Sequence, residues 1–169
     1  MMGKKEKEGA RMEFVNGLEH PAEIGALFRE YTDMLVENDP KFAYYLELQD
    51  YDEELRHLES KYGPPRGRLI LAMEGGEAAG SIALKEMDAE RCELKRLYVR
   101  PAFRGRGLGR ALTEMIIAAA REIGYKEMLL DTLPFLQSAQ HIYRAAGFRE
   151  MEKYNDSPMD DATYMKLEL

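Results

Sequence analysis

The sequence lacks long hydrophobic runs, has a single cysteine and shows no excess of positive charge. No apolar stretch approaches the roughly 18 residues that cross a membrane, so no membrane association is expected. Residues 1–11 are rich in Lys and Glu and contain no apolar segment, which indicates a flexible, solvated tail rather than a secretory signal. A lone cysteine, Cys92, excludes an intramolecular disulfide framework and fits a cytoplasmic location.

Charge and histidine content narrow the possible partners. The net charge of −7 argues against nucleic acid as the main partner, because phosphate binding requires a basic face. It is compatible with a cationic acceptor such as an amine. The three histidines, His20, His57 and His141, lack the spacing of metal ligands, so no metal is expected.

Apolar periodicity predicts an α+β protein with one domain over residues 12–169. Helical spacing predicts helices over residues 20–38, 42–61, 107–123 and 136–146. Shorter β-rich runs predict strands over residues 11–15, 68–73, 79–87, 93–99, 127–131, 148–154 and 163–169. The early strands should be antiparallel. The strands ending at Val99 and Asp131 should be parallel, because a helix connects them.

A loop rich in glycine and arginine lies between a predicted strand and a predicted helix. Its residues are Arg104, Gly105, Arg106, Gly107, Leu108, Gly109 and Arg110. The glycines allow the backbone to curl closely around a ligand. The helix that follows directs its free N–H groups and the positive end of its dipole at the loop, which favours a phosphate or pyrophosphate.

Two other nucleotide motifs fit the loop less well. A P-loop requires Gly-Lys-Ser/Thr, but Arg110 occupies the place five residues after Gly105. A dinucleotide fingerprint requires a third glycine where Arg110 stands, although Asp131 superficially resembles its ribose-binding acid. That fingerprint also requires repeated parallel units, whereas hairpins flank this loop. A glycine-rich turn with solvated arginines is the structural alternative.

The same loop resembles the coenzyme A signature of the GNAT superfamily of N-acetyltransferases. Arg104, Gly107 and Gly109 match its pattern Gln/Arg-x-x-Gly-x-Gly/Ala. Four downstream residues, Ala139, Tyr143, Gly147 and Phe148, resemble the superfamily's Ala-x-x-x-Tyr-x-x-x-Gly-Phe segment, although Leu136 replaces a common Asn. The resemblance covers roughly residues 67–169. It implies the GNAT-like acyl-CoA N-acyltransferase fold, a twisted mixed sheet of about six or seven strands with about four helices.

The resemblance also implies that acetyl-CoA is the co-substrate. The backbone of Leu97, Tyr98 and Val99 would pair with the two amides of the pantetheine arm like an added strand. The loop from Arg104 to Arg110, with the amides of residues 105–109 at its centre, would hold the pyrophosphate. Such binding would fix the thioester where an amine can reach it.

Two residues occupy positions with catalytic roles in the family. Glu93 stands where histone-type members have a general base, which would act directly or through water; otherwise it is a strand residue paired with Lys95 or Arg96. Tyr143 stands at the position of the general acid that protonates the departing thiolate; otherwise it packs in the core. A backbone N–H, that of Val99, would stabilise charge on the thioester oxygen.

These features predict an N-acetyltransferase that acetylates the primary amine of a small molecule by direct attack in a ternary complex. The alternatives are a protein acetyltransferase acting on Lys or an N-terminus, and a non-catalytic acyl-CoA sensor. The acidic, tyrosine-rich stretch of residues 42–54 is either the acceptor wall or an ordinary helix surface. A homodimer is compatible with the sequence.

Overall fold

The computed structural model describes residues 11–169, so the predicted tail lies, apart from Arg11, outside the described residues. The helices are α1 (Pro21–Asn38), α2 (Phe42–Leu48), α3 (Tyr51–Arg56), α4 (Leu58–Tyr62), α5 (Leu108–Ile123) and α6 (Gln137–Ala146). The strands are β1 (Met12–Asn16), β2 (Arg68–Glu74), β3 (Glu77–Glu86), β4 (Arg91–Val99), β5 (Glu127–Thr132), β6 (Arg149–Met151) and β7 (Thr163–Glu168). The predicted α+β class is confirmed.

The strands form one seven-stranded mixed sheet in the order β1-β2-β3-β4-β5-β7-β6. Strands β1 to β4 are antiparallel, and β4 and β5 are parallel, as the sequence predicted. The parallel register covers only three pairs and ends where Glu93 faces Leu129. Beyond that pair, the last six residues of β4 have no partner strand on the β5 side among the described residues. This opening determines where the site lies.

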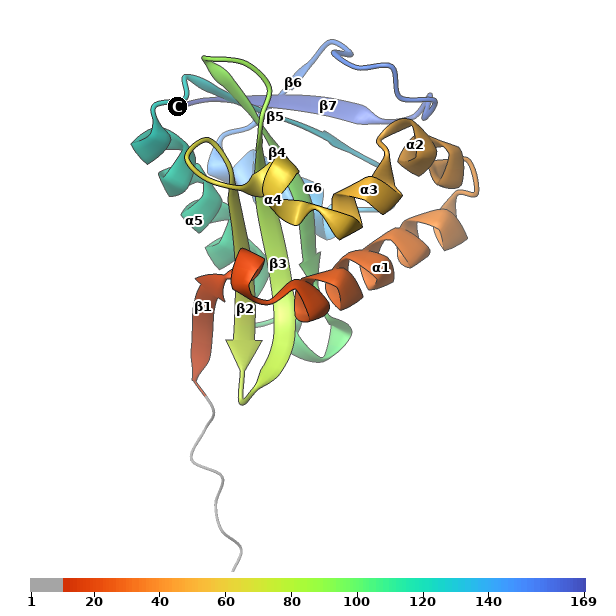
Figure 1. Cartoon of the computed structure of the whole chain (residues 1–169). Coiled ribbons are helices and arrows are strands. Elements are labelled where there is room, and N and C mark those ends of the chain that lie inside the picture. The colour runs from red at the N-terminus through yellow and green to blue at the C-terminus, as the bar shows by residue number, and fades with distance from the viewer. Residues whose placement is uncertain (1–10) are drawn as a thin grey trace, which may run out of the picture.

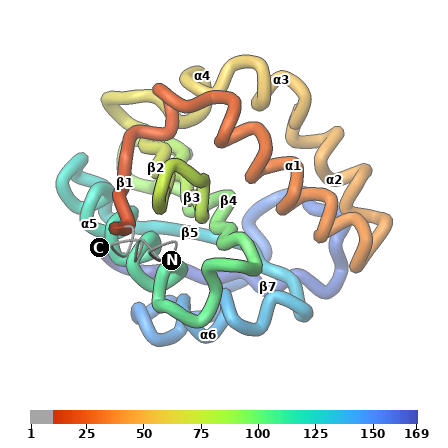
Figure 2. Tube along the Cα trace, turned by 90° about the horizontal axis from the view of Figure 1, so that it is seen from below, coloured from red at the N-terminus to blue at the C-terminus, as the bar shows by residue number. Residues whose placement is uncertain are grey.

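Helices cover both faces of the sheet. Figures 1 and 2 show α1 to α4 on one face and α5 and α6 on the other. Within the apolar stripe predicted for α5, Leu108, Leu112 and Ile116 are buried against the sheet, whereas Met115, Ala119 and Ile123 are only partly buried. Gly124 and Gly147 end α5 and α6 in the left-handed conformation, each with φ 105°. Both glycines therefore act as the predicted helix stops.

The predicted helix over residues 42–61 is three short helices, α2, α3 and α4. Asp50 interrupts it with φ 54° in the left-handed region, which Asp tolerates better than most residues. His57 separates α3 from α4. Residues 11–169 therefore contain six α-helices where about four were expected, and β6 ends at Met151 instead of residue 154. None of the helices within residues 11–169 combines the length and hydropathy needed to span a bilayer.

Candidate active site

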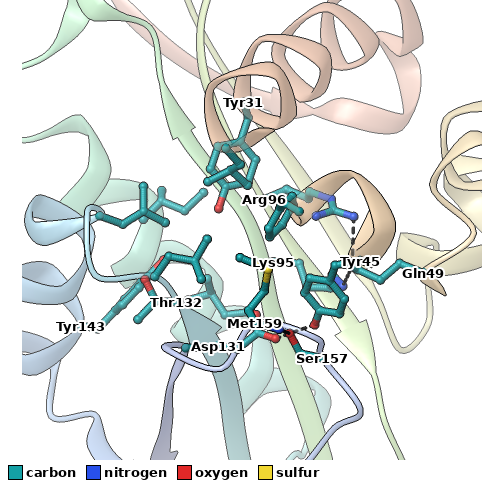
Figure 3. Close-up of a pocket in the computed structure, with 17 residues that line it drawn as sticks. Tyr31, Tyr45, Gln49, Lys95, Arg96, Asp131, Thr132, Tyr143, Ser157 and Met159 are labelled. Atoms are coloured by element: carbon teal, nitrogen blue, oxygen red, sulfur yellow. Dashed lines mark hydrogen bonds between the residues drawn. The ribbon is translucent and has the colours of Figure 1, made fainter. Parts of the chain in front are cut away.

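Two adjoining cavities occupy the opening between β4 and β5. The outer groove is lined by the end of β4, the glycine loop, the start of α5 and residues 135–142. The inner pocket lies deeper and is lined by side chains of α1, α2, β4, β5 and α6 and of residues 157–162 (Figure 3). Tyr31, Leu97 and Leu136 line both cavities. A ligand in the outer groove can therefore reach a second ligand in the inner pocket.

The glycine loop has an open backbone at the N-terminus of α5. Gly105 and Gly107 both have φ 77°, and a Cβ at either would meet no atom within 4 Å. Gly107 is the N-cap of α5, so the first N–H groups of this helix have no helical acceptor and lie beside the groove. Gly109 differs, because its added Cβ would lie 3.0 Å from Ile142 Cδ1. Gly105 and Gly107 leave space for a ligand, whereas Gly109 allows α5 and α6 to approach closely.

The three loop arginines point in different directions. Arg104 donates from Nε to the carbonyl oxygen of Val99 at 2.9 Å and lines the outer groove. Arg110 also lines the groove, and its Nε pairs with Glu114 at 2.9 Å. Arg106 pairs instead with Glu74 at 2.9 Å and does not line the groove. All the other predicted cofactor residues, Leu97, Tyr98, Val99, Gly105, Gly107, Leu108 and Gly109, line it.

The backbone of β4 presents free polar groups to the opening. The N–H of Arg100 donates to Ala79 on β3, and the backbone groups of Tyr98 also face β3. Since successive residues of a strand face opposite neighbours, Val99 faces the side of β5. Its N–H is available to an extended ligand, because the β5 register has already ended, whereas its C=O accepts a hydrogen bond from Arg104 Nε at 2.9 Å. The geometry suits the predicted pairing with the pantetheine amides.

A bulge in β4 separates the two cavities. Ser81 pairs with Tyr98 and Ala83 with Lys95, so Arg96 and Leu97 together oppose one residue of β3. Arg96 has φ 59°, which is rare for a residue with a long side chain. From this bulge the Arg96 side chain reaches α3, where it meets Glu54.

Arg96 forms a buried ion pair with Glu54 of α3. Its Nε and Nη2 donate to the Glu54 carboxylate at 2.8 and 3.0 Å, and Lys61 Nζ lies 2.7 Å from the same carboxylate. Burial would raise the pKa of Glu54, but the charges of Arg96 and Lys61 lower it to about 2. The carboxylate is therefore ionised at neutral pH, and the pair fixes the α2–α4 segment against the bulge.

The Tyr143 side chain reaches the inner pocket from α6. The residue is 6% exposed, and its ring packs on Phe148 with the centroids 5.7 Å apart. Its hydroxyl makes no hydrogen bond to any other residue that the structure describes, and Figure 3 shows the side chain at the wall of the pocket. Burial raises the pKa of Tyr143 well above its ordinary value. The hydroxyl therefore keeps its proton and can donate it or share it with a ligand.

Glu93 lies beside the inner pocket but does not line it. Its Oε2 accepts a 2.6 Å hydrogen bond from the Tyr154 hydroxyl, and its Oε1 lies 3.7 Å from Lys95 Nζ. The carboxylate that does line the pocket is Asp131, which accepts hydrogen bonds from Tyr45 at 2.6 Å and Asn155 at 2.9 Å. No sequence motif places Asp131 in this pocket. The one signal in the sequence is its position at the carboxyl end of a strand that has a parallel neighbour.

Leu136, which replaces the Asn common in the GNAT segment, lies at the N-terminus of α6. Leu136 is the N-cap of α6 and supplies no side-chain hydrogen bond to the helix. Gln140 in the first turn of α6 instead donates from Nε2 to the carbonyl of Leu133, which precedes the helix, at 2.8 Å. Within residues 11–169, no group of three or more His, Cys, Asp or Glu side chains is placed to hold a metal ion.

The chain is similar to a family of known enzymes over most of its length. The family model described as the Acetyltransferase (GNAT) family matches residues 26–148. An uncharacterized N-acetyltransferase of Schizosaccharomyces pombe is 40% identical over 131 residues, which cover 76% of this chain and 80% of the relative. An uncharacterized N-acetyltransferase of Escherichia coli is 32% identical over 104 residues, which cover 60% of this chain and 62% of that relative.

Solved structures have the same fold. The crystal structure of an acetyltransferase from Streptococcus agalactiae superimposes with a TM-score of 0.75 at 24% identity, covering 94% of this chain and 98% of the other. At this level of identity the similarity concerns the fold alone. The overall fold of this chain thus recurs in solved structures.

Proposed function

The chain belongs to the Acetyltransferase (GNAT) family, and on that premise we propose that it transfers an acetyl group from acetyl-CoA to the primary amine of a small molecule in a ternary complex. The observation that carries the proposal is the junction of the two cavities. The outer groove has the glycine loop and free strand edge that suit acetyl-CoA, and it opens onto the inner pocket that contains Tyr143. The catalytic domain would comprise residues 12–169.

Acetyl-CoA would bind by its phosphates and its amides. The pyrophosphate lies against the N–H groups of residues 105–109, where the positive end of the α5 dipole favours negative charge. The pantetheine arm extends along Leu97 and Val99 towards the inner pocket. The thioester then lies near Leu97 and Leu136, which line both cavities. The N–H of Val99 is the donor proposed for the thioester oxygen.

The chemical step needs one base and one acid. The amine must first lose a proton, because an ordinary ammonium has a pKa of about 10.4. The nitrogen then attacks the thioester carbon, the C–S bond breaks, and the thiolate takes a proton from Tyr143. The nitrogen loses its second proton to solvent as the amide forms, and a proton from solvent restores the Tyr143 hydroxyl. The ammonium thus loses two protons and the thiol gains one, so one proton is released to solvent per turnover. Glu93 is the proposed base, and it would act through water because it does not line the pocket.

The size of the inner pocket supports a small acceptor over a protein. Its cavity volume is about 40 Å³, against about 400 Å³ for the outer groove. Side chains from three helices and two strands enclose it, which leaves little room for a peptide backbone on both sides of a lysine. A panel of small primary amines, amino acids and lysine-containing peptides, assayed for CoA release, tests this proposal. We expect acceptor-dependent release with small amines. Acetyl-CoA binding without release to any acceptor would instead support a sensor.

Replacing Glu93 tests the assignment of the base. Glu93→Gln keeps the shape of the side chain and a hydrogen-bond acceptor for Tyr154. We expect the rate to fall by up to about 10²-fold, the lower part of the range for general-base catalysis, because water relays the proton. The loss should be largest at low pH, where more of the amine is protonated, and should shrink as pH rises. The pH–rate profile with a true acceptor measures it.

Asp131→Asn is the matched comparison, since Asp131 is the carboxylate that lines the pocket. If Asp131→Asn removes the low-pH activity and Glu93→Gln leaves the profile unchanged, Asp131 is the base. If neither variant changes the profile, solvent accepts the proton.

A further inference from the structure

Lys95 is a nearly buried cation in the wall of the inner pocket. Its side chain is 12% exposed, and its Nζ donates to the Gln49 side-chain oxygen at 2.6 Å. Arg96 Nη2 donates to the same oxygen at 3.3 Å. Two cationic groups thus converge on one neutral amide oxygen, a place that would suit a negatively charged oxygen better.

The charges of these two cations are compensated unequally. Arg96 makes two short hydrogen bonds to Glu54, so its charge is neutralised on the α3 side. Lys95 has no carboxylate within hydrogen-bond distance among the described residues, and Glu93 is 3.7 Å away. Burial accordingly lowers the pKa of Lys95 to about 8, although Glu93 opposes the shift. An anion bound beside Lys95 would supply the missing charge.

The same pocket contains a group of opposite charge. Asp131 is held by Tyr45 and Asn155, both of which donate to its Oδ2. Figure 3 shows Asp131 and Lys95 between Tyr143 on one side of the pocket and Gln49 on the other. The pocket therefore offers a carboxylate for an ammonium and an ammonium for a carboxylate. Leu35, Phe42 and Met159 add apolar surface.

We propose that the acceptor is a small amino acid, a compound with a carboxylate a few bonds from its primary amine. The carboxylate binds at Lys95 Nζ and replaces the Gln49 side-chain oxygen as its hydrogen-bond acceptor. The amine lies towards Asp131 and Tyr143, where the thioester arrives from the outer groove. This inference rests on the proposed function and specifies its substrate class. A simple amine would leave Lys95 with only the more distant carboxylate of Glu93, at 3.7 Å, as a counter-charge.

Matched acceptor triplets test the inference in the full-length protein. Glycine, alanine and 2-aminobutyrate are each compared with their carboxamide and their decarboxylated amine, at equal concentrations of the unprotonated amine. We expect kcat/KM for the amino acid to exceed that of both analogues by about 10- to 100-fold, the contribution of a hydrogen bond to a charged group. Equal values for the amino acid and its analogues would overturn the inference and leave the N-acetyltransferase function standing. Absence of CoA release from every acceptor would refute both.

Lys95→Met keeps most of the side-chain volume and removes the charge. We expect it to abolish the preference for the amino acid, mainly through a higher KM for that acceptor, with KM for acetyl-CoA unchanged. Lys95→Arg should retain most of the preference. The control is Lys126→Met, because Lys126 is exposed and pairs with Glu90 at 2.8 Å outside both cavities. If Lys95→Met folds and keeps the preference, the carboxylate binds elsewhere; if it does not fold, the triplets alone decide.

Discussion

Tyr143→Phe should lower kcat by about 10²–10⁴-fold, the usual contribution of general acid catalysis, with little change in acetyl-CoA affinity or stability. The reason lies in the surroundings of the hydroxyl. The ring packs on Phe148, and phenylalanine keeps that contact. The hydroxyl has no partner among the described residues, so its removal leaves no buried group unpaired. Its raised pKa keeps the proton available to the departing thiolate at neutral pH.

Steady-state kinetics at saturating acetyl-CoA, together with thermal unfolding, measure the effect. Tyr125→Phe is the matched control, because the Tyr125 hydroxyl donates to the Arg66 carbonyl at 2.8 Å and lines neither cavity. It should keep the wild-type kcat and lose about 1 kcal/mol of stability with its hydrogen bond. Wild-type turnover in Tyr143→Phe would make Tyr143 a core residue and leave the thiolate to be protonated by solvent.

Local sequence signals predicted the part of the fold that follows residue 67. These signals depend on residues within one element or on neighbours in sequence. They are the α5 stripe, the glycines that end α5 and α6, and the turn after Glu74. Parallel pairing of β4 and β5 followed from the helix between them. The breaks at Asp50 and His57 carry no Gly or Pro, so a continuous helix was the simpler interpretation. Leu46 and Tyr62 on either side of the breaks pack into separate clusters, an arrangement that no local sequence pattern encodes.

The outer groove can be predicted from the sequence, whereas the inner pocket cannot. The outer groove is built largely from one contiguous loop and the helix that follows it, so a motif is enough to find it. The inner pocket brings together residues that are far apart in the chain. Tyr45 and Asn155, for example, bond to Asp131 from 86 and 24 positions away. The positive φ of Arg96 and its pairing with Glu54 are likewise visible only in three dimensions.

Gly107→Val should weaken acetyl-CoA binding by about 10²–10⁴-fold, which corresponds to the loss of two hydrogen bonds to a charged phosphate. The folded chain has room for the side chain, since a Cβ at Gly107 meets no atom within 4 Å, but that room is where the pyrophosphate would bind. Gly124→Val is the control, because Gly124 has φ 105° and equally open space at the far end of α5, about 24 Å along the helix. Both variants impose backbone strain and should lose similar stability, whereas calorimetry should find weakened binding only for Gly107→Val. Wild-type affinity in that variant would place the pyrophosphate elsewhere.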